Sequence, residues 1–288
     1  MDEIHRDEEP TEEPAEERSK IWGLAVAILA LLAVIAVLYY FFFMKKPELP
    51  APAPAAESGL RAEAEKAPVT PELEPLAFPA VPLVASDDAV RQFAAAIAAD
   101  PQFSKWLLTK DLIRKFVVSV DNVANGLSPK SHIDFFSPEG GFRVSRTKDG
   151  MLVDPATYAR YAPVVAVVQS IDAPAAVRLY RAVEPLLQEA YNELGYPGVD
   201  FDDTLGRAMS ELLETPMVNG PIRLEQKVLS YAMTDETLEG LSLAQKQLLR
   251  MGPKGVQAVD DKIRQIAALL GIPASRLPQT KVYTPAAR

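Results

Sequence analysis

The longest apolar stretch of the chain covers residues 21–43, where no charged side chain occurs. A helix of this length, at about 1.5 Å per residue, is long enough to cross a hydrocarbon core of about 30 Å. Trp22 lies at its start, and two tyrosines and three phenylalanines lie at its end, as is typical of a membrane interface. The run is longer than the apolar core of a signal peptide, about 7–15 residues. The pattern therefore predicts one uncleaved transmembrane helix at 21–43.

The segments on either side of this span are polar. Residues 1–20 are acidic and contain two prolines, so they are expected to form a disordered tail. Residues 44–85 interleave prolines with alanine and glutamate, which predicts a semi-rigid, extended linker. Lysines and arginines are balanced across the span, so orientation is inferred from the short leader, which favours a cytoplasmic amino terminus. Gly23, Ala27 and Ala30 share a helix face and leave open a homodimer through this helix.

Residues 86–273 carry the periodic patterns of one folded domain, and residues 274–288 are expected to form a flexible tail. Apolar residues three or four positions apart, with caps and prolines at the ends, predict a series of helices. Alternating residues on both sides of the turn at 147–150 predict a β-hairpin. Helices are expected at about 86–99, 103–108, 112–125, 155–168, 174–194, 202–214, 242–251 and 256–270, and further short strands at 222–224 and 228–231.

Strands and helices do not alternate as they would in a parallel sheet, so the predicted fold class is mainly α. The domain is expected to be a multi-helix domain with one or two small β-hairpins. Ser86 is expected to cap the first helix, and Pro185 is expected to kink or divide the helix at 174–194. The apolar stripe of the helix at 112–125 is assigned to Leu112, Phe116, Val120 and Val123.

Composition excludes several kinds of chemistry. The chain has no cysteine, which rules out disulfides, thiolate metal sites and cysteine nucleophiles. Its two histidines cannot build a multi-histidine metal site. A formal net charge of −9 argues against a nucleic-acid-binding protein, which usually has a basic face. No cofactor or metal is therefore expected, and no nucleic acid is expected as a partner.

The motifs that suggest catalysis are weak. Ser145 and Lys148 have the spacing of the S-x-x-K motif of penicillin-binding enzymes, but the serine lies in a predicted strand and no K-T-G motif follows. Asp200, Asp202 and Asp203 lack the calcium-loop pattern, and Asp202 or Asp203 is expected to cap the next helix. No catalytic residue is assigned from the sequence.

Aromatic and basic residues gather in one region of the domain. Tyrosines and arginines are enriched in binding hot spots, and the candidates for partner contacts are Tyr158, Arg160, Tyr161, Arg178 and Arg181. The same residues could instead hold the helices together, since tyrosines at helical spacing often belong to a core. The sequence leaves open whether this tyrosine cluster lines a groove or fills the core.

Several segments of the domain together resemble a bacterial family of uncharacterised, single-pass, envelope-facing membrane proteins, a domain-of-unknown-function family. The resemblance implies a bacterial origin and an inner-membrane location, and it implies no activity or site residues. The segments that carry it lie at residues 112–122, 158–161, 179–181, 185–197, 219–221 and 248–253.

These observations favour a membrane-anchored, envelope-facing binding or scaffolding protein. The alternative is a cell-wall-modifying or other metal-independent envelope enzyme that uses carboxylates. The expected location is the bacterial inner membrane, with a single pass, a cytoplasmic amino terminus and a periplasmic main domain. The expected partners are the membrane, through residues 21–43, and another envelope protein or cell-wall component.

The predicted orientation can be tested with reporter fusions. Alkaline phosphatase fused after residue 288 is expected to be active in intact cells, because its disulfides form only outside the cytoplasm. The same reporter fused at residue 10 is expected to be inactive. An inactive carboxyl-terminal fusion would contradict the predicted orientation.

Overall fold

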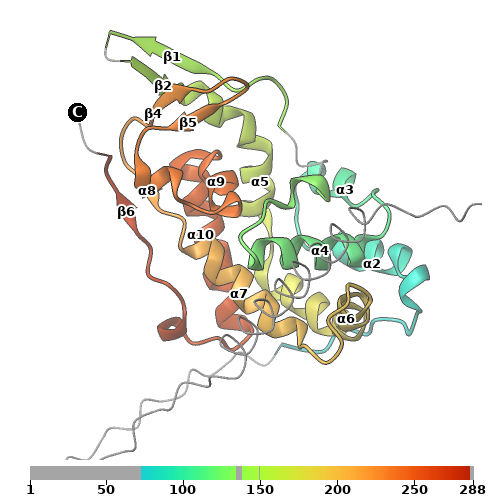
Figure 1. Ribbon diagram of the computed structural model, residues 1–288. Helices are drawn as coiled ribbons and strands as arrows, with labels where there is room; N and C mark the ends of the chain where they lie inside the picture. Colours follow the sequence, from blue (N-terminus) through green and yellow to red (C-terminus); the bar gives the residue numbers. More distant parts are fainter. Residues whose placement is uncertain (1–72, 134–137, 149, 286–288) are drawn as a thin grey trace, which may run out of the picture. The chain divides into compact units, whose positions relative to one another are not determined.

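Helices make up most of the part of the chain that the structure describes, which is residues 73–133, 138–148 and 150–285 of a computed structural model (Figure 1). The predicted tail (1–20), transmembrane helix (21–43) and most of the linker lie outside these residues. None of the described helices has the length and apolar character that a membrane span needs. The mainly helical fold class with small antiparallel strands is confirmed for the described part.

Most α-helices overlap the ranges that the sequence predicts, but the helix predicted at 155–168 begins as a 3-10 turn, and the short helix at Glu236–Glu239 was not predicted. The α-helices are α2 (Asp87–Ala94), α3 (Pro101–Trp106), α4 (Leu112–Ala124), α5 (Ala162–Ser170), α6 (Ala173–Glu193), α7 (Phe201–Leu213), α8 (Glu236–Glu239), α9 (Leu243–Leu249) and α10 (Gly252–Leu269). The 3-10 turns are η1 (Leu83–Ala85), η2 (Pro129–Ser131), η4 (Pro155–Tyr161) and η5 (Ala274–Arg276).

The strands form two small sheets. The antiparallel sheet has the order β1-β2-β4-β5, and a parallel pair joins β3 to β6. The first sheet contains the predicted hairpin at 147–150, to which β4 and β5 are added through the pairs Leu152–Arg223 and Leu224–Met233. The strands are β1 (Val144–Thr147), β2 (Gly150–Val153), β3 (Met217–Val218), β4 (Arg223–Gln226), β5 (Tyr231–Met233) and β6 (Val282–Tyr283).

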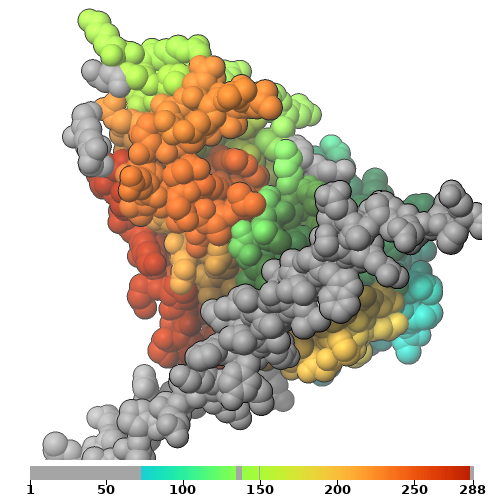
Figure 2. All heavy atoms as spheres, in the orientation of Figure 1, coloured from blue at the N-terminus to red at the C-terminus, as the bar shows by residue number. Residues whose placement is uncertain are grey.

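Three clusters of buried side chains hold these elements together. The largest joins α2, α4, α6 and α7. A second cluster packs the antiparallel sheet on α8 and α9, with Leu224, Leu238 and Leu249 among its members. A third joins α7 to α10 through Leu213 and Ala267. Figure 2 shows the resulting surface, in which β4, β5, α8 and α9 (orange) lie beside the β1–β2 hairpin (light green).

Two local predictions within the helices need correction. The buried residues of α4 are Ile113, Val117, Val120 and Val123. Phe116, which was assigned to the apolar stripe, is 43% exposed, because α6 and α7 pack against the face that carries Ile113 and Val117. α6 is one continuous helix in spite of Pro185. Its apolar side chains are buried before and after the proline, and this packing keeps the helix intact where one backbone hydrogen bond is lost.

The folded domain extends beyond both predicted boundaries. Leu76, Phe78 and Val81, within the predicted linker, pack against the largest cluster, and Leu83 belongs to it. These apolar residues alternate with prolines, which do not prevent an extended segment from packing. In place of the flexible tail predicted at 274–288, the described residues up to 285 include buried Leu277 and strand β6 paired with β3.

Asp87 caps a helix that is distant in the sequence. Ser86 does not cap α2 as predicted, because its hydroxyl donates a hydrogen bond to the Leu83 carbonyl oxygen. The Asp87 carboxylate instead accepts hydrogen bonds from the backbone amides of Asp111 (2.8 Å) and Leu112 (2.9 Å) at the start of α4. Asp111 itself has a positive φ of 57° and provides no cap. α2 therefore determines where α4 begins.

We expect Asp87→Ala to lower the free energy of unfolding by about 1–2 kcal/mol, because two amides at the start of α4 lose their acceptor. Asp88→Ala is the matched control on the same turn. Its exposed ion pair with Arg91 should contribute less than about 1 kcal/mol. Urea denaturation measures both variants, and equal losses would contradict the capping role.

Candidate functional site

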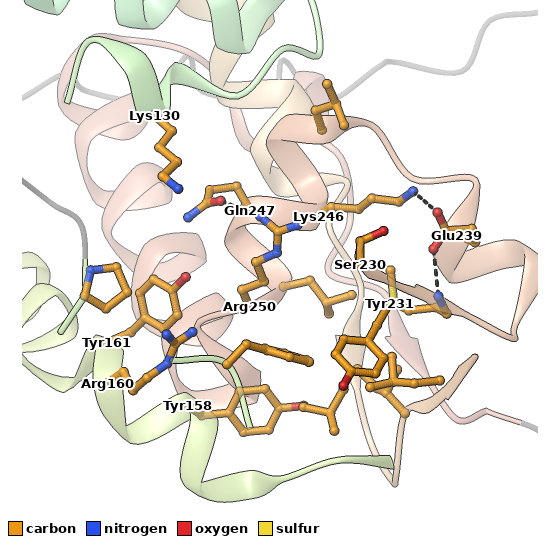
Figure 3. A pocket seen from close by; sticks show the side chains of 18 of the residues that line it. Lys130, Tyr158, Arg160, Tyr161, Ser230, Tyr231, Glu239, Lys246, Gln247 and Arg250 are labelled. Atoms are coloured by element: carbon orange, nitrogen blue, oxygen red, sulfur yellow. Dashed lines mark hydrogen bonds and ion pairs between the residues drawn. The ribbon is translucent and has the colours of Figure 1, made fainter. Parts of the chain in front are cut away.

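A cleft of about 890 Å³ lies between η2, η4, α9 and the β4–β5 hairpin (Figure 3). η4 contributes Tyr158, Arg160 and Tyr161 to its lining, and the end of α9 contributes Gln247 and Arg250. A cleft of this size is in the range of small-ligand sites, about 300–1,000 Å³. The other described lining residues used below are Lys130, Phe142, Lys227, Val228, Leu229, Tyr231, Glu239 and Lys246.

Two contacts position the η4 side of the cleft. Gly252, at the turn into α10, has φ +74°, and a methyl group there would lie 2.6 Å from Cγ of Tyr158. The Tyr158 ring therefore packs directly on the backbone between α9 and α10. Arg160 donates hydrogen bonds from Nε to the Thr157 carbonyl oxygen (3.1 Å) and from Nη1 to the Gly140 carbonyl oxygen (2.8 Å).

The tyrosines of η4 differ in their exposure. Tyr161 is buried beneath Arg160, whose guanidinium carbon lies 5.5 Å from the centre of the Tyr161 ring. Tyr158 is partly buried, and this burial raises the pKa of its hydroxyl. The Tyr158 hydroxyl therefore keeps its proton at neutral pH and supplies no negative charge to the cleft.

The described lining of the cleft is strongly cationic. Lys130, Arg160, Lys227, Lys246 and Arg250 line it, and the only carboxylate among the described lining residues is that of Glu239. In Figure 3 the charged ends of Lys130, Arg160 and Arg250 face the same open space, whereas that of Lys246 points toward Glu239. Concentrated positive charge in a concave site attracts anions and raises their local concentration. The electrostatics therefore favour an anionic ligand.

Glu239 is committed to internal contacts. Its carboxylate accepts hydrogen bonds from Lys246 Nζ (2.7 Å) and from the Met233 amide (2.8 Å). Partial burial opposes ionisation of Glu239, but these two hydrogen bonds and the charges of Lys246 and Lys227 outweigh burial and lower its pKa. Glu239 is thus ionised at neutral pH and neutralises Lys246, which leaves the other cations of the cleft available to a ligand.

Lys130 and Arg250 are the basic residues least engaged in the fold. Lys130 is exposed, and its ammonium forms no ion pair with any residue in the described ranges. Arg250 is also exposed, and its Nη1 donates a hydrogen bond to Oε1 of Gln247 (2.9 Å). Lys227, by contrast, pairs with Glu225 at 2.5 Å. Lys130 and Arg250 can therefore turn toward a ligand at little cost to the fold.

The hairpin between β4 and β5 adds apolar surface that the sequence analysis did not single out. Val228 and Leu229 are each 97% exposed at its tip and line the cleft. Tyr231, at the start of β5, packs against Phe142, with ring centroids 5.9 Å apart. The sequence analysis expected a strand at 228–231, but β5 begins only at Tyr231, and Val228 and Leu229 lie in the turn before it. Two adjacent, exposed apolar residues in a turn indicate a contact surface.

The sequence-predicted contact residues separate into two groups. Tyr158, Arg160 and Tyr161 come together in the cleft. Arg178 and Arg181 lie on α6 and do not line it, and Arg181 donates a hydrogen bond to the Leu269 carbonyl oxygen of α10 (2.8 Å). The predicted five-residue patch is therefore not one surface.

Three further tyrosines of the same region, Tyr180, Tyr191 and Tyr196, have structural contacts. Tyr191 is fully buried, and its hydroxyl accepts a hydrogen bond from Thr204 (2.9 Å). Tyr196 stacks on the Tyr191 ring. The Tyr180 hydroxyl donates a hydrogen bond to Asp202, and burial together with this bond raises the pKa of Tyr180. The tyrosines of η4 therefore line the cleft, whereas Tyr191 of α6 belongs to the core.

The acidic cluster before α7 is also structural. Asp200, rather than Asp202 or Asp203, caps the helix by accepting a hydrogen bond from the Asp202 amide (2.9 Å). Within the described ranges, no group of three or more histidine or acidic residues could hold a metal ion. Ser145 lies in strand β1, so it does not have the helical position that the S-x-x-K chemistry needs.

The described part of the chain is therefore a mainly helical domain with a cationic, aromatic cleft. Residues 112–267 match the family described as "Protein of unknown function (DUF3014)", and because this match covers more than half of the chain, the chain belongs to that family. The matched region includes η2, η4, the β4–β5 hairpin and α9, which together build the cleft. No curated protein and no solved structure matches the chain.

We expect Gly252→Ala to lower the free energy of unfolding by about 2–5 kcal/mol, because it combines a strained positive φ with a clash against Tyr158. The control is Gly198→Ala, where φ is +80° and nothing lies within 4 Å of the added methyl group. That variant should lose only about 1–2 kcal/mol. Thermal and urea unfolding measure the difference. Equal losses of unfolding free energy in the two variants would show that the Tyr158 ring can move aside without destabilising the fold.

Proposed function

We propose that this protein is a membrane-anchored, envelope-facing binding protein whose helical domain holds an anionic envelope component in the cleft beside α9. The observation that carries the proposal is the excess of basic over acidic residues in the described lining, on a chain whose net charge is −9. Carboxylate or phosphate groups are the partners that arginine and lysine side chains recognise.

The cleft is better suited to binding than to the alternative carboxylate-based catalysis. A general acid needs a carboxyl group that keeps its proton near neutral pH. Glu239 is the only carboxylate in the described lining, and its pKa is lowered by the contacts with Lys246 and Met233. The cleft instead offers charge and aromatic surface, which are the usual components of a recognition site.

The proposed location follows from the sequence. The apolar run at 21–43 would anchor the chain in the bacterial inner membrane, and the proline-rich segment after it would hold the domain on the periplasmic side. In this arrangement the partner is another envelope protein or a cell-wall component with exposed carboxylates or phosphates. The protein would link that component to the membrane.

The proposal predicts that partner capture depends on the two least engaged basic residues. In cells that express the full chain, we expect Lys130→Ala with Arg250→Ala to reduce in vivo crosslinked partners at least tenfold, because each charge-assisted hydrogen bond contributes about 1.5–3 kcal/mol. Crosslinking followed by quantitative mass spectrometry measures this loss. The melting temperature should change little, since both side chains are exposed.

The matched control is Arg178→Ala, which removes an arginine of the same domain outside the cleft. Its crosslinked partners should be those of the unaltered protein. Partners that persist in the Lys130→Ala, Arg250→Ala variant, or that disappear equally in Arg178→Ala, would refute the cleft as the binding site.

A further inference from the structure

A second cavity, of about 670 Å³ and partly open to solvent, lies in the helical part of the domain. Residues of α4, α6, α7, α9 and α10 line it, and its described lining is almost entirely apolar. An apolar cavity of this size that opens to the surface is in the range of ligand sites, about 300–1,000 Å³.

The few polar groups that line this cavity are engaged with one another or with other parts of the protein. Lys115 Nζ donates a hydrogen bond to the Thr109 hydroxyl, and the Ser119 hydroxyl donates to the Lys115 carbonyl oxygen (2.6 Å). Tyr180 is bonded to Asp202 outside the core. Because the Ser119 and Tyr180 hydroxyls are already bonded and Lys115 is the one charged residue of the described lining, most of this lining offers no partner to water, and the cavity favours hydrocarbon.

The apolar cavity and the cationic cleft share a wall. Pro129, Ile133 and Gln247 line both. Lys130 of the cleft is adjacent in sequence to Pro129, and Arg250 bonds to Gln247 at 2.9 Å. Positive charge therefore lies beside the residues that line both spaces, and Figure 3 shows Lys130, Gln247 and Arg250 on the same side of the cleft.

We propose that the cleft and the apolar cavity form one site for an anionic amphiphile, with its carboxylate or phosphate head near Lys130 and Arg250 and one hydrocarbon chain inside the cavity between α4 and α10. This inference rests on the proposed function, because it assumes that the cleft binds an anion. It goes further by assigning the ligand class. The positive charges of Lys130 and Arg250 are complementary to an anionic head group, and the apolar lining of the cavity is complementary to a hydrocarbon chain.

The proposed site predicts that binding affinity rises steeply with the length of the ligand's hydrocarbon chain. Each methylene group that enters the cavity should tighten binding by up to about fourfold, until the chain fills the space. The uncharged methyl ester of the same chain should bind at least tenfold more weakly than the acid, because it loses the charge-assisted contacts with the two basic residues.

The probe is hexadecanoate with a photoactivatable diazirine at the end of its chain, added to the full-length protein in phosphatidylcholine nanodiscs. We expect labelling on peptides of α4 and α10, competed by hexadecyl phosphate and by unlabelled hexadecanoate far better than by octanoate. A second arm places the same diazirine on phosphatidylglycerol within the nanodisc. Labelling of α4 and α10 in either arm supports the site, and the arm that labels more strongly identifies a free amphiphile or a membrane lipid as the source.

Ser119→Phe places a ring inside the cavity and should abolish labelling of α4 and α10 with the fold retained. Ser210→Phe is its matched control. Ser210 makes the same bond to the carbonyl oxygen four residues earlier (3.0 Å) but does not line the cavity. If Ser119→Phe does not fold, Ala176→Phe blocks the same space from α6. The Lys130→Ala, Arg250→Ala variant should lower labelling at least tenfold.

Labelling confined to residues 21–43, labelling of α4 that persists in the cavity-filling variants, or no labelling in either arm would overturn the inference. The absence of labelling is also expected if another segment of the chain already fills the cavity.

Competition with ethyl phosphate distinguishes failure of this inference from failure of the proposed anion binding in the cleft. If it displaces the crosslinked partners as well as hexadecyl phosphate does, the cleft binds anions but the cavity binds no chain, and only this inference fails.

Discussion

The turn between α9 and α10 is the constraint on which the geometry of the cleft depends. Gly252 adopts a positive φ there and has no side chain, so the Tyr158 ring can rest on the backbone. η4 contains Tyr158 together with Arg160 and Tyr161. α9 carries Lys246 and Gln247, and Arg250 follows its last residue. One contact between a ring and a glycine thus fixes the distance between two walls of the site. Any side chain at position 252 would have to separate them.

The charge of the cleft shows why overall composition was a poor guide to the partner. In the sequence analysis the net charge of −9 served only to argue against a nucleic-acid partner, because charge was counted along the chain. Folding brings together basic residues that are up to 120 positions apart, from Lys130 to Arg250. One of them, Lys246, is neutralised by its ion pair with Glu239. Local potential depends on this three-dimensional arrangement and not on the net charge of −9.

The features that were predictable from sequence are those determined by neighbouring residues. The hairpin around 147–150 and the helix that begins after Ser242 depend on a few adjacent positions, and both are confirmed. The pairing of β3 with β6, the packing of residues 76–83 and the cap that Asp87 provides for α4 depend on partners that are distant in the chain. Tyr158, Arg160 and Tyr161 are neighbours in the sequence, were predicted as contact residues and line the cleft. Val228 and Leu229 line it too, but they were not predicted as contact residues.

The cleft and the apolar cavity would make different contributions to the proposed site. The exposed charges of Lys130 and Arg250 are well solvated, so their contacts with an anionic head supply only part of the affinity. An apolar cavity without charge would accept any hydrocarbon, since burial of methylene groups is favourable but not directional. A cationic entrance that shares Gln247 with an apolar interior combines the two contributions. The chain then provides most of the affinity, and the charged head determines which hydrocarbon is held and in which direction it enters.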